Sequence, residues 1–282
     1  MAADRLSLAL VALLGATAPV AAAPPNIVAI LLDDLGVGEI GPLAHGSVTP
    51  NIDALAARGA VYVNGYSPAP MCGPSRVGMM TMRQPQEFGA YRNSPDAWLP
   101  KATTFANILR KKGYRTSLVG KWHPWTQNPL GFGFYSFYGF IGGEHDYWQD
   151  DLMRGRNAIR WTEYLTTDFT DEAIAILKLK TSAPKLVVVS YSAPHTPMQT
   201  PPGSACDPTN TRCVWLAMMS HVDADIGRLV AAAGNGALIV LAGDNGCDTG
   251  DSSCKAPLRG HKQSAYEGGS RVPFVVTWPG HV

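Results

Sequence analysis

The sequence predicts an α/β fold in which a large, mainly parallel sheet is covered by helices on both faces. Apolar, β-branched segments of strand length alternate with helical segments, which is typical of parallel strands joined by crossover helices. Hydrophobic residues make up 46% of the 282 residues, enough for one large core. The 29 glycines and 22 prolines indicate many turns and loops. We therefore expect one large domain.

The first half of the chain contains two predicted strands and two predicted helices. Residues 26–32 (NIVAILL) form a continuous apolar run, which is typical of a strand buried on both faces. A helix is expected over residues 49–57, ending before Gly59, and another over residues 101–112, ending at Gly113. Residues 114–119 then read as a strand.

The second half repeats the alternation. Helices are expected over residues 168–180 and 216–233, because both segments have helical periodicity. Strands are expected over residues 185–191 (KLVVVSY), 237–242 and 274–277, because these runs are short, apolar and rich in valine.

The charge balance excludes one class of function. Only 16% of the residues are charged, and 23 Lys and Arg against 22 Asp and Glu give a formal net charge of +1. A nucleic-acid-binding protein usually carries a clear basic excess. We therefore expect no nucleic-acid partner.

Residues 1–22 have the features of a signal peptide. Arg5 precedes an apolar run over residues 6–14, and small residues follow it, so cleavage is expected after Ala22. The run is too short to span a bilayer, and no later segment reaches that length without charge. We expect residues 23–282 to be exported, to the periplasm or the medium, without a membrane anchor.

The five cysteines divide into two local pairs and one remainder. Cys206 and Cys213 enclose a short polar segment, as do Cys247 and Cys254. Two local disulfides are expected in an oxidising compartment, although the spacing leaves cross-pairing open. Cys72 is the odd cysteine.

Polar side chains follow four of the predicted strands directly. In open α/β sheets, ligands bind beyond the carboxyl ends of the strands, so these side chains predict one shared site. They are Asp33 and Asp34, Lys121 and His123, His195, and Asp244 and Asn245.

The predicted site offers oxygen ligands together with cations. Asp33, Asp34, Asp244 and Asn245 provide only oxygen donors, which suit calcium or magnesium better than zinc. Three crowded carboxylates would raise one another's pKa unless a cation lay between them. A divalent ion beside cationic side chains attracts an anionic tetrahedral group. These side chains are Arg76, Lys121, His123, His195 and Lys262.

Residues 71–76 (MCGPSR) identify the class of enzyme. The pattern Cys-x-Pro-Ser-Arg resembles the signature of the sulfatases, members of the alkaline phosphatase superfamily. The resemblance covers residues 25–279 and implies an alkaline-phosphatase-like α/β catalytic domain over residues 23–282. Its blocks are PNIV with Asp33-Asp34, residues 72–83, GKWH at 120–123, APHTP at 193–197, DNG at 244–246, and PLRGHK at 257–262 with EGGSRVP at 267–273.

The resemblance implies that Cys72 does not act as a thiol. In sulfatases this cysteine is oxidised to formylglycine by a formylglycine-generating enzyme, which reads Cys72, Pro74 and Arg76. The hydrated aldehyde carries two hydroxyls. One attacks sulfur to form a sulfate ester, and the other expels sulfate by re-forming the aldehyde.

The family's roles map onto this chain residue by residue. The resemblance implies that Asp33, Asp34, Asp244 and Asn245 bind calcium, with magnesium the less favoured ion. Lys121 and Lys262 resemble the cations that hold the sulfate oxygens, and Arg76 the group that orients the diol. His195 is similar to the acid that protonates the leaving alcohol, and His123 to the base that deprotonates the second hydroxyl.

The resemblance predicts hydrolysis of a sulfate monoester on an aryl compound or a glycan. A phosphate or phosphonate ester hydrolase of the same superfamily and an inactive remnant stay open as alternatives. Two features depart from the family. Met82 stands where sulfatases usually have glycine, and we expect it to alter the packing of the helix that carries Arg76. The family's smaller C-terminal subdomain would follow Val282, so we expect a truncated fragment.

Overall fold

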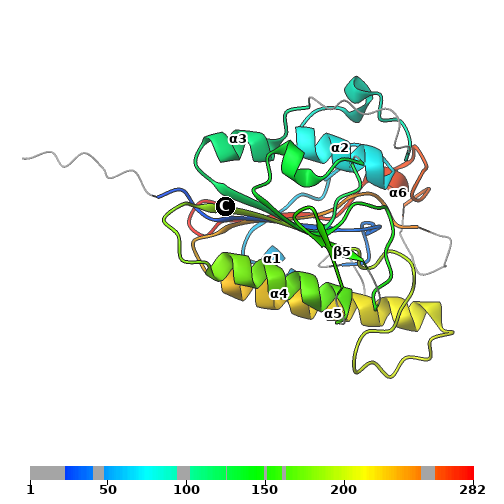
Figure 1. Cartoon of the computed structure of the whole chain (residues 1–282). Helices are drawn as coiled ribbons and strands as arrows, with labels where there is room; N and C mark the ends of the chain where they lie inside the picture. Colours follow the sequence, from blue (N-terminus) through cyan, green and yellow to red (C-terminus); the bar gives the residue numbers. More distant parts are fainter. Residues whose placement is uncertain are drawn as a thin grey trace, which may run out of the picture.

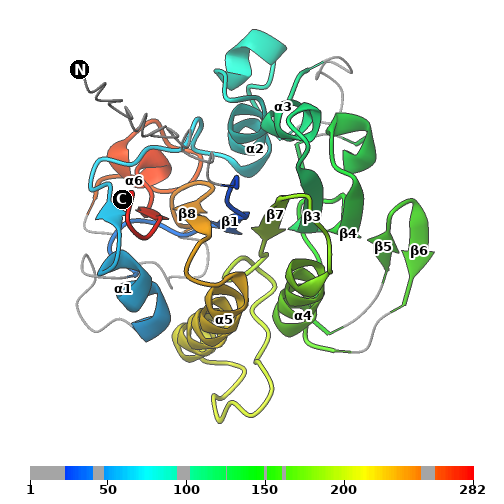
Figure 2. The same cartoon turned by 90° about the vertical axis from the view of Figure 1, so that its left-hand side faces the viewer.

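The computed structural model describes residues 23–40, 48–93, 102–124, 126–148, 151–160, 163–248 and 258–282. These residues form a nine-stranded mixed sheet with helices on both faces (Figure 1), which confirms the predicted α/β fold. The helices lie on both faces of this sheet (Figure 2). The first face carries α2 (Cys72–Thr81) and α3 (Phe105–Lys111); the second carries α1 (Pro50–Ala56), α4 (Leu165–Lys178) and α5 (Thr211–Ala233).

The strand order is β2-β9-β8-β1-β7-β3-β4-β5-β6. The five strands from β8 to β4 run parallel, and the remaining pairings at both edges are antiparallel. The strands are β1 (Ile27–Leu32), β2 (Ala60–Val61), β3 (Arg115–Lys121), β4 (Ser136–Phe140), β5 (Leu152–Arg154), β6 (Asn157–Ile159), β7 (Lys185–Ser190), β8 (Leu238–Gly243) and β9 (Phe274–Thr277).

The four strands with polar residues at their ends are neighbours in the order β8-β1-β7-β3. Gly120 allows β3 and β7 to pair closely at this end, because a Cβ there would lie 2.0 Å from the carbonyl oxygen of Ser190. Its φ of +104° also requires glycine. Parallel pairing therefore brings the carboxyl ends of all four strands to one edge of the sheet.

The sequence does not predict four of the described strands. β2, β5 and β6 are two or three residues long, too short for an alternating pattern to appear. β4 (SFYGF) is buried along most of its length but interrupted by glycine. All four lie outside the block β9-β8-β1-β7-β3, in which every strand was predicted.

The predicted helices are present, with shifted ends. α3 begins at Phe105 rather than at residue 101, because the Thr104 hydroxyl accepts a hydrogen bond from the backbone of Asn107 and caps the helix. α5 begins five residues before the predicted start, where the Asn210 side chain accepts from the backbone N–H of Cys213. α4 starts three residues before the predicted Asp168. Caps, rather than hydrophobic periodicity, fixed the starts of α3 and α5.

The structure confirms one of the two predicted local disulfides. Cys206 and Cys213 form a disulfide, as predicted. Cys247 is disulfide-bonded too, and its expected partner Cys254 lies outside the described residues. Cys72 is a free, buried cysteine.

The expected signal peptide, residues 1–22, also lies outside the described residues. No helix in the described part of the chain combines the length and apolar character needed to cross a bilayer.

Candidate active site

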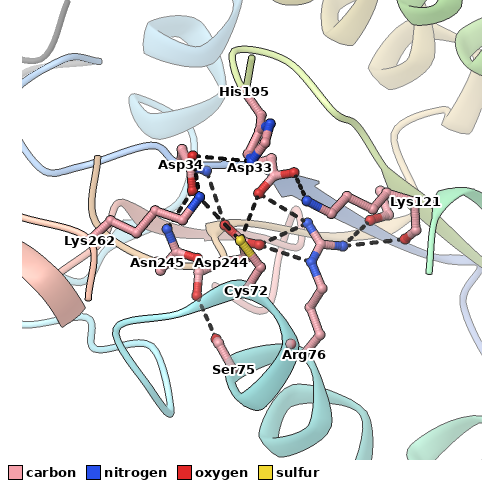
Figure 3. Close-up of polar contacts among 12 residues, drawn as sticks. Asp33, Asp34, Cys72, Ser75, Arg76, Lys121, His195, Asp244, Asn245 and Lys262 are labelled. Atoms are coloured by element: carbon pink, nitrogen blue, oxygen red, sulfur yellow. Dashed lines mark hydrogen bonds and ion pairs between the residues drawn. The ribbon is translucent and has the colours of Figure 1, made fainter. Parts of the chain in front are cut away.

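The residues predicted to form the site converge on the carboxyl edge of the central strands, and Figure 3 labels all of them except His123. Asp33 and Asp34 follow β1, Asp244 and Asn245 follow β8, and Lys121 ends β3. His195 follows β7, Cys72 and Arg76 lie in the first turns of α2, and Lys262 lies in the loop before α6 (Glu267–Ser270).

Four of these side chains surround a single point. One ligand atom from each of Asp33, Asp34, Cys72 and His195 lies within 4.8 Å of the others. The Cys72 Sγ is 3.6 Å from Asp33 Oδ1 and 3.8 Å from Asp34 Oδ1. His195 Nε2 is 3.5 Å from Asp34 Oδ2.

The backbone at Asp34 explains how two consecutive carboxylates reach the same site. Successive side chains of an extended strand point to opposite faces. Asp34 instead has φ +58°, a left-handed conformation that aspartate tolerates better than most residues. Its N–H also donates to Asp244 Oδ1 at 3.1 Å, which ties the end of β1 to the end of β8.

Each of the three carboxylates has a cationic partner. Lys121 contacts Asp33, Lys262 Nζ lies 2.7 Å from Asp34 Oδ2, and Arg76 Nη2 lies 2.8 Å from Asp244 Oδ2. All six side chains are buried. Unpaired buried charges are costly, so this pairing of three anions with three cations balances the site.

Arg76 joins the ends of four strands through one guanidinium. Its Nε donates to Asp244 after β8 at 2.9 Å, and its Nη1 donates to Ser190 Oγ of β7 at 2.6 Å. Nη1 also donates to the Lys121 carbonyl of β3 at 3.3 Å, and Nη2 lies 3.7 Å from Asp33 after β1. A planar group with five donors is suited to such bridging, which a lysine could not reproduce.

The carboxylates differ in their pKa shifts. Burial, followed by the charge of Asp33, raises the pKa of Asp244 to about 7. Burial would also raise the pKa of Asp33, but Lys121, His195, Arg76 and Lys262 together hold it well below its usual value. The upward shift expected for crowded carboxylates is therefore seen at Asp244, while at Asp33 the neighbouring cations reverse it.

Asn245 has one satisfied and one unsatisfied side-chain atom. Its Nδ2 donates to Asp34 Oδ1 at 2.7 Å and to the Gly246 carbonyl. Its buried Oδ1 has no hydrogen-bond partner among the described residues. A buried amide oxygen without a partner is rare in folded proteins, and a cation is one group that would satisfy it.

Cys72 is the first residue of α2 and is fully buried. Burial raises the pKa of its thiol well above the usual value, and the charge of Lys121 only partly opposes this. The unmodified thiol is therefore a poor nucleophile at neutral pH. The helix start is held from outside by Asn93, whose Oδ1 accepts from the Gly73 N–H at 2.9 Å.

The two predicted histidines differ in their contacts. His195 Nδ1 lies 2.6 Å from the Thr196 carbonyl, so Nδ1 carries a proton and Nε2 faces Asp34. His123 has no side-chain hydrogen bond within the described residues, and its buried Nδ1 is unpartnered. Burial, with the charges of Lys121 and Arg76, lowers the pKa of His123 to about 3.

Three polar residues contact the site but were not predicted. The Ser75 hydroxyl donates to the Asp244 carbonyl, Ser190 accepts from Arg76, and Asn93 contacts Gly73. Ser75 lies inside the Cys-x-Pro-Ser-Arg motif and Ser190 lies at the end of a predicted strand, so the sequence could have indicated both as site residues. No sequence pattern indicates Asn93.

Met82 differs from the expectation. Its side chain is 75% exposed, so it does not change how α2 packs. The residue instead caps α2 in the left-handed conformation, with φ 55° and ψ 34°. Glycine adopts this conformation without strain, and a residue with a Cβ does not.

Comparisons with known proteins identify the family of this chain. A family model described as Sulfatase matches residues 25–282. Arylsulfatase A of Homo sapiens is 30% identical over 306 aligned positions, covering 93% of this chain and 60% of that protein. N-acetylgalactosamine-6-sulfatase of Mus musculus is 29% identical, covering 100% of this chain and 62% of that protein.

The chain is also similar to a solved structure in fold and in sequence. The crystal structure of Ps i-CgsB in complex with k-i-k-neocarrahexaose has a TM-score of 0.83 and 30% sequence identity, and it covers 92% of this chain and 66% of that one. The chain spans about 60% of the length of the curated relatives it matches. These matches do not favour the alternative of a phosphate or phosphonate ester hydrolase. The family model matches residues 25–282, and the fold gathers the predicted residues at one edge of the sheet. This chain is therefore a member of the sulfatase family.

Proposed function

We propose that this protein hydrolyses a sulfate monoester, using a formylglycine made from Cys72 and a bound divalent ion. The observation that carries the proposal is the position of Cys72 at the start of α2. Its Sγ lies within 3.8 Å of the carboxylates of both Asp33 and Asp34, beside three buried cations. A nucleophile next to a metal and to positive charge is what transfer of an anionic sulfuryl group requires.

The donor set fits a hard ion, and we propose calcium. Asp33, Asp34 and Asp244 offer carboxylate oxygens, and the unpartnered Oδ1 of Asn245 offers a neutral one. Oxygen donors of this kind suit calcium better than zinc. When bound, the ion polarises the sulfate group and stabilises negative charge on its oxygens.

The formylglycine supplies two hydroxyls when hydrated, one to accept the sulfuryl group and one to release it. Lys121 and Lys262 hold the sulfate oxygens, and Arg76 orients the nucleophile. With both ring nitrogens protonated, His195 gives the proton on Nε2 to the ester oxygen as the S–O bond breaks, keeps the proton on Nδ1, and the bonding electron pair leaves with the alcohol. His123 accepts a proton in the later step, which is the same for every substrate.

Maturation takes place before folding under this proposal. The formylglycine-generating enzyme would read Cys72, Pro74 and Arg76, yet all three are buried in the folded chain. An enzyme cannot reach a side chain that is 1% exposed at the start of a packed helix. We therefore place the modification on the unfolded chain.

The substrate class and location are also proposals. One related structure contains k-i-k-neocarrahexaose, and one relative is named N-acetylgalactosamine-6-sulfatase, which supports a sulfated carbohydrate. Another relative is named Arylsulfatase A, which supports an aryl sulfate. Residues 1–22 would direct export to the periplasm or the medium. The disulfide between Cys206 and Cys213 supports an oxidising compartment.

Mass spectrometry of the tryptic peptide 59–76 tests the proposal directly. Co-expression with a formylglycine-generating enzyme should replace the CH2SH group of Cys72 by an aldehyde. The converted chain should hydrolyse an aryl sulfate faster than the matching aryl phosphate. Cys72→Ala should abolish turnover while thermal unfolding stays cooperative. A fully unmodified thiol, a preference for phosphate, or full activity of Cys72→Ala would each contradict it.

A further inference from the structure

The loop after β4 contacts both histidines assigned to proton transfer. β4 pairs with β3, so residues 141–148 pass next to His123, which follows β3. The backbone N–H of His123 donates to the Ile141 carbonyl at 3.1 Å. The same loop reaches the segment after β7 at Tyr147, whose hydroxyl donates to the His195 carbonyl at 2.9 Å.

Gly143 lies directly against the imidazole of His123. A Cβ at this position would lie 2.6 Å from both Cε1 and Nε2 of the ring and 3.2 Å from Nδ1. Real Cβ atoms do not approach so closely, so the ring occupies space that only glycine leaves free. Because Nδ1 has no hydrogen bond in the described part of the chain, packing fixes this ring.

Tyr147 is held on several sides and is fully buried. Its ring stacks on Tyr164 with centroids 5.4 Å apart, and its N–H donates to Gln199 Oε1 at 2.6 Å. Its carbonyl accepts from the Leu165 N–H at the start of α4. The hydroxyl therefore has a fixed position from which it anchors the backbone of His195.

Asp146 and Gln199 strengthen the same connection. Gln199 Nε2 donates to Asp146 Oδ2 at 2.7 Å, so one side chain from each segment bridges to the other. The loop after β4 is thus attached to the segment after β7 at Asp146 and at Tyr147. A shift of either segment would move His195 relative to Asp34.

We infer that residues 143–147 position both histidines, His123 through packing of Gly143 on its ring and His195 through the Tyr147 hydroxyl. Gly143 and Tyr147 are positioning residues, since neither is assigned a contact with substrate. The chemical roles of the two rings rest on the proposed function, whereas the contacts do not.

The two positions predict different kinetic defects. An acid that protonates the leaving oxygen matters most for a sugar sulfate, whose alcohol is a poor leaving group, and least for 4-nitrophenyl sulfate. Tyr147→Phe should therefore lower kcat/KM for a sugar sulfate about 3–10-fold, the loss expected for one hydrogen bond. The value for 4-nitrophenyl sulfate should change less than about 2-fold.

Gly143→Ala should affect the later, substrate-independent step. With 4-nitrophenyl sulfate, kcat and KM should fall together by about 10-fold or more, leaving kcat/KM unchanged. A burst of nitrophenol should precede the slow steady state. Gly142→Ala is the matched control, because among the described residues a Cβ there would meet only the Glu144 carbonyl, at 3.6 Å.

Histidine ring NMR tests the contacts without any turnover. Tyr147→Phe should shift the Cε1–H signal of His195, and Gly143→Ala that of His123. Tyr138→Phe also removes one hydroxyl donor, but the Tyr138 hydroxyl donates to Asp168 on α4, so this variant should shift neither signal. Signals are assigned through histidine substitutions.

Three outcomes would overturn the inference. The first is that Tyr147→Phe lowers kcat/KM equally for the sugar sulfate and for 4-nitrophenyl sulfate. The second is that Gly142→Ala shifts the His123 ring signal as much as Gly143→Ala does. The third is that the ring signals stay unchanged in both Tyr147→Phe and Gly143→Ala. A wild-type chain that hydrolyses neither sulfate would instead contradict the proposed function. The NMR shifts would still decide the inference in that case.

Discussion

Arg76 and Asp244 form a fully buried ion pair although they are 168 residues apart in the sequence. Two guanidinium nitrogens lie within 2.9 Å of one carboxylate oxygen. The pair attaches α2, which carries Cys72, to the end of β8. Removing one partner of a buried pair leaves the other charge without compensation, which is costly.

We expect Arg76→Met to lower the free energy of unfolding by about 3–5 kcal/mol, because Asp244 and Asp33 would lose a buried cation. Urea denaturation monitored by circular dichroism measures this. Arg83→Met is the control, because Arg83 forms an exposed ion pair with Glu87. This variant should lower the free energy of unfolding by less than about 1 kcal/mol. Similar losses in the two variants would show that burial of the pair is unimportant.

Met82→Gly should stabilise the protein by about 0.5–1 kcal/mol, because glycine removes the strain of a left-handed helix cap. Met82→Ala keeps a Cβ at the same φ and should gain little. Thermal unfolding of both variants makes the comparison. A gain from alanine as large as that from glycine would mean that the exposed methionine side chain, and not the backbone, is the source of strain.

Added calcium should raise the melting temperature. At a free concentration of about 100 times Kd the stabilisation is about 2.7 kcal/mol, which corresponds to roughly 5 °C or more. A chelator should reverse the shift, and magnesium should give a smaller one. Asp34→Ala should lose the response, while Asp207→Asn, an exposed aspartate that bonds Thr209, should keep it. A full response in Asp34→Ala would argue against the proposed ion site.

Asp168 should give the protein a pH-dependent loss of stability. Burial raises the pKa of Asp168 to about 6, above its value in the unfolded chain. Between about pH 4 and pH 6 the folded state therefore binds more protons, so the free energy of unfolding falls as pH rises through this window. The free energy of unfolding should fall by about 1 kcal/mol across this window, after allowance for the partial exposure of Asp168, and Asp168→Asn should abolish this fall.

Parallel denaturation curves at pH 4 and pH 7 measure the effect of Asp168→Asn. The variant should gain stability relative to the wild type at the higher pH. Tyr138→Phe provides a second test, because the Tyr138 hydroxyl donates to Asp168 and opposes its raised pKa. Without this hydrogen bond the pKa of Asp168 should rise further, so in Tyr138→Phe the free energy of unfolding should keep falling to a higher pH. If the difference in free energy of unfolding between wild type and Asp168→Asn is the same at pH 4 and at pH 7, the prediction is refuted.

Residues next to strong strand signals could be predicted from sequence. Asp33 and Asp244 each follow a continuous apolar run, so the parallel fold was enough to bring them to one edge. Met82 could be noticed only as a departure from the family pattern, and its left-handed φ came from the structure. Gly143 and Tyr147 lie in a loop with no periodicity, after a strand that was not predicted. Their contacts with the histidines could not be inferred.

The sequence by itself determined the alternation of helices with strands β1, β3, β7, β8 and β9, the Cys-x-Pro-Ser-Arg motif and the oxygen-rich donor set. These features depend on neighbouring residues and on side-chain chemistry. The tertiary structure decided that Arg76 pairs with Asp244, Lys121 with Asp33 and Lys262 with Asp34. It also decided which loop holds the two histidines. Those contacts join residues that are far apart in the chain, and their geometry exists only once the parallel strands are in register.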